Sequence, residues 1–258
     1  MKFSFYKQLS ISVMAVSVLG SSANAILRRH DVPDSLYVER GTCYPQVGKI
    51  PRHGIATLIA PHWLITAAHV AQGLPRNARA IFGDSVYTIA QTFVHPRWRE
   101  KGADDIALIR LQEPLLHFAP ARVFVEKSEV GKVVTFVGAG KTGTGLTGPK
   151  KEDGVFRGAT NVVDSVSDAW LYFTFDDSAN GTALEGISGP GDSGGPALLE
   201  RGDQLYVVGV SVWGLPGKRG NGTYGAIEGY TRLSNYVKWI DDTMNSADSA
   251  AAVTSSAK

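Results

Sequence analysis

The sequence predicts an all-β fold, either a sandwich or a barrel, for most of the 258 residues. Short apolar runs rich in β-branched residues recur along the chain, and glycine-rich segments separate them. Strand and helix patterns do not alternate, so a parallel α/β sheet is not indicated. The 29 glycines also favour a turn-rich chain, because glycine adopts turn conformations at no steric cost.

The individual elements follow from the same patterns. Residues 55–66 predict two short strands around a Pro61-His62 turn. Further buried strands are expected at 106–111, 133–137 and 205–212, the last ending at Trp213-Gly214. Loops are expected at 138–148, 181–195 and 214–225.

The C-terminal part of the chain predicts one helix followed by a tail. Leu233, Tyr236, Val237 and Ile240 recur at helical spacing, so they would share one face. Residues 244–258 are mostly small and polar, and we expect them to be disordered.

The first 25 residues resemble a signal peptide. Lys2 and Lys7 precede the mostly apolar run 9–20, and Ala23-Asn24-Ala25 offers small residues at a cleavage site. A membrane anchor is the alternative, but the run is shorter than the ~20 residues that a spanning helix needs. We therefore expect export, to a periplasm or out of the cell, with cleavage after Ala25 and no membrane attachment afterwards.

Charge and cysteine content limit the function classes. Lys2 and Lys7 are the only charges in residues 1–25, so their removal lowers Lys+Arg from 26 to 24, equal to the 24 Asp+Glu. This balance does not indicate a nucleic-acid-binding surface. Cys43 is the only cysteine, which excludes an intramolecular disulfide and is more typical of bacterial exported proteins; we expect it to pack in the interior. The six histidines lack metal-ligand spacing, so neither a metal nor a cofactor is expected, and His95 is expected in a surface loop.

The segment Gly191-Asp192-Ser193-Gly194-Gly195-Pro196 has the composition of a nucleophile turn. A serine between glycines can project its hydroxyl into a cleft, and the same turn can aim the N–H groups of Gly191 and Ser193 at one point. Such fixed donors form an oxyanion hole. A plain Gly/Pro turn is the alternative.

A serine hydroxyl needs a neighbouring base, and the base needs an acid that orients it. His69 follows a predicted strand after the small residues Ala67 and Ala68. Asp105 directly precedes the apolar run from Ile106, so it is the preferred acid, whereas the adjacent Asp104 is expected to face solvent.

The segments Thr66-Ala67-Ala68-His69, Asp105-Ile106-Ala107-Leu108 and Gly191–Pro196, in this order, resemble the chymotrypsin/trypsin family of serine endopeptidases. The similarity extends from Ile26 to about Ile240. It implies two six-stranded antiparallel β-barrels with a C-terminal helix, spanning 26–243 with a boundary near residue 125. It also implies a catalytic triad of His69, Asp105 and Ser193 that hydrolyses protein or peptide substrates through an acyl-enzyme.

The resemblance implies two further features. In the family a new N-terminal aliphatic residue pairs with the acid that precedes the nucleophile, and here these would be Ile26 and Asp192. Signal cleavage alone would then activate the enzyme; the alternative is that residues 26–30 are a frayed terminus. In the specificity pocket, Ile187 falls at the base, where trypsin-like enzymes carry an aspartate.

Glu228 falls on the wall of the same pocket and could receive a basic side chain there. The alternatives are that Glu228 faces solvent or pairs with Arg219. Val212 and Gly214 could offer backbone groups to an extended substrate.

Two other functions remain to be weighed. An inactive binding protein on the same fold is the first, because fold does not fix function. The second is an α/β-hydrolase esterase, whose G-x-S-x-G elbow is matched by residues 191–195. That fold requires the order Ser, acid, His, whereas here His69 and Asp105 precede Ser193.

Overall fold

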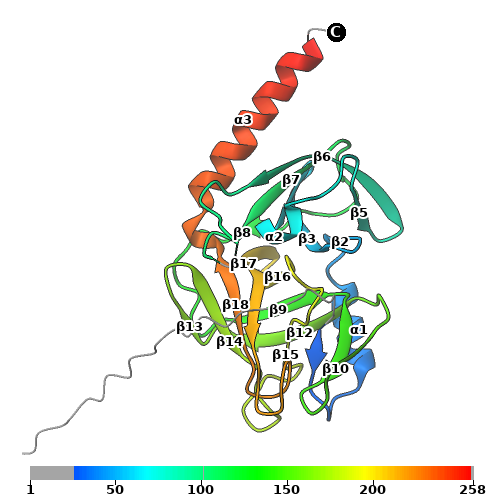
Figure 1. Cartoon of the computed structure of the whole chain (residues 1–258), viewed down its shortest axis with the longest axis vertical. Coiled ribbons are helices and arrows are strands. Elements are labelled where there is room, and N and C mark those ends of the chain that lie inside the picture. Colours follow the sequence, from blue (N-terminus) through cyan, green and yellow to red (C-terminus); the bar gives the residue numbers. More distant parts are fainter. Residues whose placement is uncertain (1–25, 101, 257–258) are drawn as a thin grey trace, which may run out of the picture.

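The computed structural model describes residues 26–100 and 102–256, and the expected signal peptide lies outside them. The first half of the described chain forms a closed antiparallel barrel of six strands, in the spatial order β2-β3-β4-β7-β6-β5. Figure 1 shows this barrel above the second half. Its strands are β2 (Val47–Ile50), β3 (Gly54–Ala60), β4 (Trp63–Thr66), β5 (Arg79–Phe82), β6 (Ser85–Val94) and β7 (Ala107–Leu111).

The second half forms a curved sheet that surrounds a core of its own but does not close by strand pairing among the described residues. The order is β12-β9-β16-β17-β18-β14-β13, and β8 pairs beside β17. The strands are β8 (Arg122–Val123), β9 (Val133–Gly138), β12 (Arg157–Val162), β13 (Ser165–Val166), β14 (Trp170–Thr174), β16 (Pro196–Arg201), β17 (Gln204–Leu215) and β18 (Ile227–Arg232).

Among the described residues the second half is thus an open sheet rather than the expected closed six-stranded barrel. The side-chain amide of Asn161 on β12 donates to the carbonyl oxygens of Thr174 on β14 and of Gly186, so a side chain links β12 to β14.

A small third sheet holds the N-terminal segment against the second half. Its order is β11-β10-β1-β15, with β1 parallel to β10 and antiparallel to β15. The bounds are β1 (Leu27–Arg28), β10 (Lys141–Thr144), β11 (Gly148–Glu152) and β15 (Gly186–Ile187). Residues 26–30 are therefore docked rather than frayed: Ile26 and Leu27 are fully buried.

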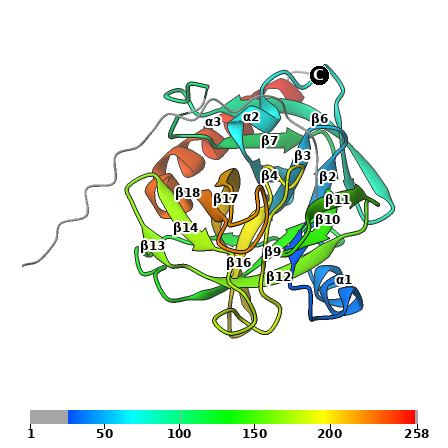
Figure 2. The same ribbon diagram turned by 60° about the horizontal axis from the view of Figure 1, so that its bottom comes forward.

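Helices are few. α1 (Asp34–Thr42) packs on β12 (Figure 2), and α2 (Ala68–Ala71) carries His69. After a 3-10 turn, α3 (Val237–Ser256) packs Ile240 and neighbouring apolar residues against the first barrel. No helix among the described residues is both long and apolar enough to cross a membrane.

Three expectations about single segments are wrong. Residues 244–256 are helical rather than a disordered tail, because Asp248 accepts hydrogen bonds from Trp63 and Arg110 and ties this part of α3 to the barrel. Cys43 is exposed at the end of α1. His95 is buried, with its ring edge-on to those of Tyr236 and Trp239.

Candidate active site

His69 is held by both oxygens of one buried carboxylate. Asp105 Oδ2 lies 2.7 Å from His69 Nδ1, and Asp105 Oδ1 accepts the His69 backbone N–H at 3.0 Å. β4 pairs antiparallel with β7, which places α2, just after β4, next to Asp105, just before β7. A carboxylate only accepts hydrogen bonds, so Nδ1 carries the proton and Nε2 is left as an acceptor.

Asp104 turns the other way. Its carboxylate accepts hydrogen bonds from Arg97 and from the Tyr236 hydroxyl, and its side chain is 17% exposed. The expectation that Asp104 faces solvent is therefore wrong. The structure pairs His69 with Asp105 alone.

The Ser193 turn lies between the two halves. The Ser193 carbonyl oxygen accepts from Ile55 N–H of the first barrel at 2.8 Å, and Gly194 N–H donates to Ser211 of the second sheet at 2.9 Å. Gly194 has φ +79°, and a Cβ there would overlap Thr66 Oγ1. Only glycine fits so close to the segment that leads to His69. The Ser193 hydroxyl makes no hydrogen bond to His69 among the described residues.

Two N–H groups of this turn are free. Asp192, Gly194 and Gly195 each donate a backbone hydrogen bond, but Gly191 and Ser193 donate none to the described residues. Gly191 has φ +102°, which turns the chain tightly beside Ser193. Two unpaired N–H groups in one turn are the kind of donors that an oxyanion hole needs.

Asp192 is fully buried, and its carboxylate accepts hydrogen bonds from the N–H groups of Gly140 and Gly189. Burial raises the pKa of this carboxyl to about 8. Ile26 is buried and directly precedes β1. The first residue of β1, Leu27, pairs with Gly143 of β10. No ion pair joins Ile26 to Asp192 among the described residues, since in the uncleaved chain the Ile26 nitrogen is an amide.

At the expected specificity pocket, the residue that contacts Glu228 is Ser188 and not Ile187. The Ile187 side chain is 2% exposed and packs in a separate small core. Successive side chains of a strand point to opposite faces, so Ser188 points the other way. Sequence reasoning missed Ser188, because only the pairing of strands brings it to Glu228.

Glu228 is buried without a cationic partner among the described residues. Its carboxylate accepts from the Ser188 N–H and hydroxyl, each at 2.9 Å, and burial raises its pKa to about 8. Both alternatives for Glu228, exposure to solvent and pairing with Arg219, are therefore wrong. A Cβ added at Gly214 would lie 3.9 Å from Glu228 Oε1, so Gly214 borders the same space.

Val212 occupies a bulge in β17. The pairing of β17 with β18 shifts between Ser211 and Trp213, so Val212 is the extra residue. Its side chain is half-buried against the core of the first barrel. Trp213 lies instead against Gly229 on the outer face.

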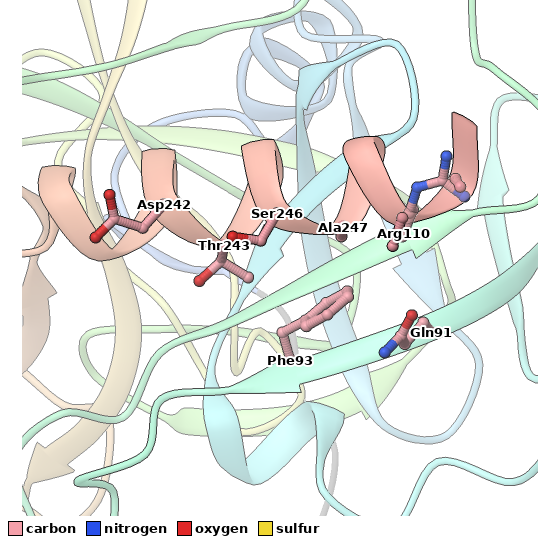
Figure 3. Close-up of a pocket in the computed structure, with 9 residues that line it drawn as sticks. Gln91, Phe93, Arg110, Asp242, Thr243, Ser246 and Ala247 are labelled. Atoms are coloured by element: carbon pink, nitrogen blue, oxygen red, sulfur yellow. The ribbon is translucent and has the colours of Figure 1, made fainter. Parts of the chain in front are cut away.

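A groove lies elsewhere, between α3 and strands β6 and β7 (Figure 3). Phe93 and Gln91 of β6 and Arg110 of β7 face Thr243, Ser246 and Ala247 of α3. None of the candidate site residues lines this groove.

Comparison with known proteins agrees with this geometry. Complement C1s subcomponent of Sus scrofa is 30% identical over 243 residues, which covers 77% of this chain and 33% of that protein. The inactive CLIP domain-containing serine protease A3 of Aedes aegypti is 28% identical over 223 residues, covering 75% and 46%. The chain thus spans less than half the length of these curated relatives.

A solved structure supports the fold alone. Neuropsin, a serine protease expressed in the limbic system of mouse brain, superposes with a TM-score of 0.64 at 21% identity, covering 84% of this chain and 98% of that one. This confirms the predicted chymotrypsin-like fold. The family model described as Trypsin matches residues 48–240, and the chain therefore belongs to the trypsin family.

Proposed function

We propose that this chain is an exported serine endopeptidase whose triad is His69, Asp105 and Ser193. The observation that carries the proposal is the two-point hold of Asp105 on His69, at 2.7 and 3.0 Å, beside a serine turn with two free N–H groups. A binding protein would have no need of an oriented imidazole next to unpaired donors.

The chemistry follows from the atoms. His69 Nε2 takes the proton of the Ser193 hydroxyl as Oγ attacks the peptide carbonyl carbon. The oxygen that gains charge is stabilised by the N–H groups of Gly191 and Ser193, and Asp105 stabilises the imidazolium. His69 then gives its proton to the leaving amine, the C–N bond breaks, and an acyl-enzyme remains. Water, deprotonated by His69, attacks the acyl carbon; the bond to Ser193 Oγ breaks, His69 returns the proton to Oγ, and the acid product leaves.

Activation involves Ile26 and Asp192. In this proposal, cleavage after Ala25 turns the Ile26 amide into an ammonium that pairs with the buried carboxylate of Asp192. Pairing with this ammonium lowers the pKa of Asp192 from its raised value and fixes the turn that holds Gly191 and Ser193. Removal of one partner of a buried ion pair costs roughly 3–5 kcal/mol, enough to disorder the oxyanion hole.

Substrate preference rests on the pocket bordered by Ser188, Gly214 and Glu228, above the Ile187 core. A buried carboxylate without a cation favours a substrate with a Lys or Arg side chain before the cut bond. Val212 and Gly214, at the open edge of β17, offer backbone groups to the peptide. Protein or peptide substrates, a periplasmic or extracellular location, and a bacterial source are parts of the same proposal.

A fluorophosphonate probe tests the reaction directly. The protein starting at Ile26 is treated with the probe, and its intact mass is compared with that of Ser193→Ala. One adduct on the first and none on the second is expected. An unlabelled, well-folded protein would instead support an inactive member of the family, as the name of the Aedes aegypti relative describes.

A further inference from the structure

A loop of residues 216–226, here called the rim loop, connects β17 to β18 beside the proposed pocket. Its two ends are held together by the pairing of Leu215 with Ile227. Gly214, just before it, borders the space next to Glu228, which lies just after it. The rim loop therefore lies at the edge of the proposed pocket.

Within the rim loop, the outer turn is fastened to its own last residues. Lys218 N–H donates to the Tyr224 carbonyl oxygen, and Gly217 and Gly220 form a bridge. The Thr223 hydroxyl accepts from Arg219 N–H. This turn consequently moves with Thr223 and Tyr224.

Tyr224 is in turn fastened to other segments. Its N–H donates to the Gly145 carbonyl oxygen at 3.0 Å. Its hydroxyl accepts the His30 N–H at 3.1 Å and lies 2.8 Å from His30 Nδ1. His30 belongs to the N-terminal segment, directly after β1, so this segment holds the rim loop by a side-chain contact.

The Tyr224 ring also joins a small core behind the pocket, which consists of Leu27, Phe175, Ile187, Tyr224 and Ala226. Ile187 immediately precedes Ser188, whose N–H and hydroxyl hold Glu228. The same core therefore links the N-terminal strand, the rim loop and the segment that supports Glu228. Because Cys43 is the only cysteine, no disulfide within the chain can make this connection.

We infer that Tyr224, held by His30, is a positioning residue that fixes the rim loop at the pocket and so determines how tightly substrate binds. The inference rests on the proposed function. In Tyr224→Phe the loss of the hydroxyl removes the contact between the rim loop and His30, while the ring can still fill the small core. The triad and the free N–H groups of Gly191 and Ser193 make no contact with His30 or Tyr224, so the bond-making steps are unaffected.

The test compares Tyr224→Phe and His30→Ala with Tyr206→Phe. The control removes a tyrosine hydroxyl on β17, where the ring packs against Phe124 at 5.8 Å. For each protein, kcat and KM are measured with the fluorogenic peptide that the wild type cleaves fastest, together with the rate of Ser193 labelling by a small fluorophosphonate. His30→Ala loses only the contact of Nδ1 and keeps the backbone N–H bond, so its KM should rise by about 3- to 10-fold. Tyr224→Phe loses both contacts, so its KM should rise at least as much. The kcat and the labelling rate should stay within about 2-fold of the wild type.

Hydrogen exchange gives a readout that does not depend on activity. Amides of residues 217–226 should exchange faster in Tyr224→Phe than in the wild type, by about the same 3- to 10-fold, while those of β7 are unchanged. Unchanged exchange in 217–226 overturns the inference, as does a loss of kcat and labelling that parallels any loss of thermal stability. An unlabelled wild type with faster loop exchange in the variant would leave the inference standing and contradict the proposed function instead.

Discussion

The Thr231 hydroxyl donates a hydrogen bond of 2.8 Å to the carbonyl oxygen of Asp105. Thr231 is fully buried on β18 of the second sheet, whereas the carboxylate of Asp105 holds His69 on the first barrel. One half of the molecule thus supports the acid that orients the base on the other half. Serine at position 231 could keep this bond, but valine could not.

Thr231→Val should therefore destabilise the protein by about 1–3 kcal/mol, because it leaves a buried acceptor unpaired. It should also lower kcat, since Asp105 loses its support. Urea unfolding and peptide hydrolysis measure the two effects. Thr231→Ser is the matched control and should retain most activity; equal losses in Ser and Val variants would contradict a role for the hydroxyl.

Asp105→Asn should reduce kcat by about four orders of magnitude, because the amide no longer holds the tautomer that leaves Nε2 as an acceptor. Asp104→Asn is the neighbouring control. It changes contacts to Arg97, Tyr236 and His95 but none to His69, so its kcat should remain within about an order of magnitude of the wild type. Steady-state hydrolysis of one peptide decides the matter, and comparable losses in both variants would argue against Asp105 as the orienting acid.

Glu228→Gln should change how stability depends on pH. The pKa of Glu228 is about 8 in the folded protein, above about 4.3 for an unfolded glutamate. Between these values the folded state binds the extra proton, so its contribution to stability is full below pH 4.3 and is lost as pH rises through 8. The wild type should lose up to about 1.4 kcal/mol per pH unit relative to Glu228→Gln across this window.

Chemical unfolding of the two proteins at pH 5, 6, 7 and 8 measures this difference. A stability gap that does not grow with pH would show that the Glu228 carboxyl is not protonated in the folded state. The same variant should cleave peptides with Arg or Lys before the cut bond less well than the wild type; an unchanged preference would remove Glu228 from the pocket.

A protein that carries one extra residue before Ile26 should be nearly inactive. The extra residue displaces the ammonium from the buried Asp192, and a chain that begins at Ile26 is the control. Fluorophosphonate labelling of both forms compares their oxyanion holes. Equal labelling would mean that Asp192 needs no cation in the active enzyme.

Asp248→Ala should lower the free energy of unfolding by about 1 kcal/mol, since the variant loses hydrogen bonds from both Trp63 and Arg110. Asp242→Ala removes an exposed pair with Lys238 on the same helix and should have no measurable effect. Urea midpoints distinguish the two. Identical midpoints would show that α3 is held by its apolar face alone.

The sequence predicted the parts of this molecule whose signal is local. β3 and β4 around the Pro61-His62 turn have the expected apolar runs, and the glycines that flank Ser193 stand where the backbone must turn. α1 was missed, because its nine residues include Gly41 and no clear apolar stripe, and its stability depends on packing against β12.

Other features depend on contacts between distant segments. The helical state of residues 244–256 follows from Asp248 reaching Trp63, and the burial of His95 follows from the rings of α3 and the turn before it. Ser188 and Glu228 are 40 positions apart in the sequence and come into contact only in the folded chain. Patterns within a short stretch of sequence do not predict such contacts between distant residues.

The Ser193 turn is hydrogen-bonded to Ile55 on one side and to Ser211 on the other. The conformation of this turn therefore depends on the docking of the two halves, because each half supplies one of its hydrogen bonds. Separation of the two halves would break both hydrogen bonds even if each half kept its own strands. Under the proposed function, a newly made chain would therefore become able to cut peptides only once its two halves have docked.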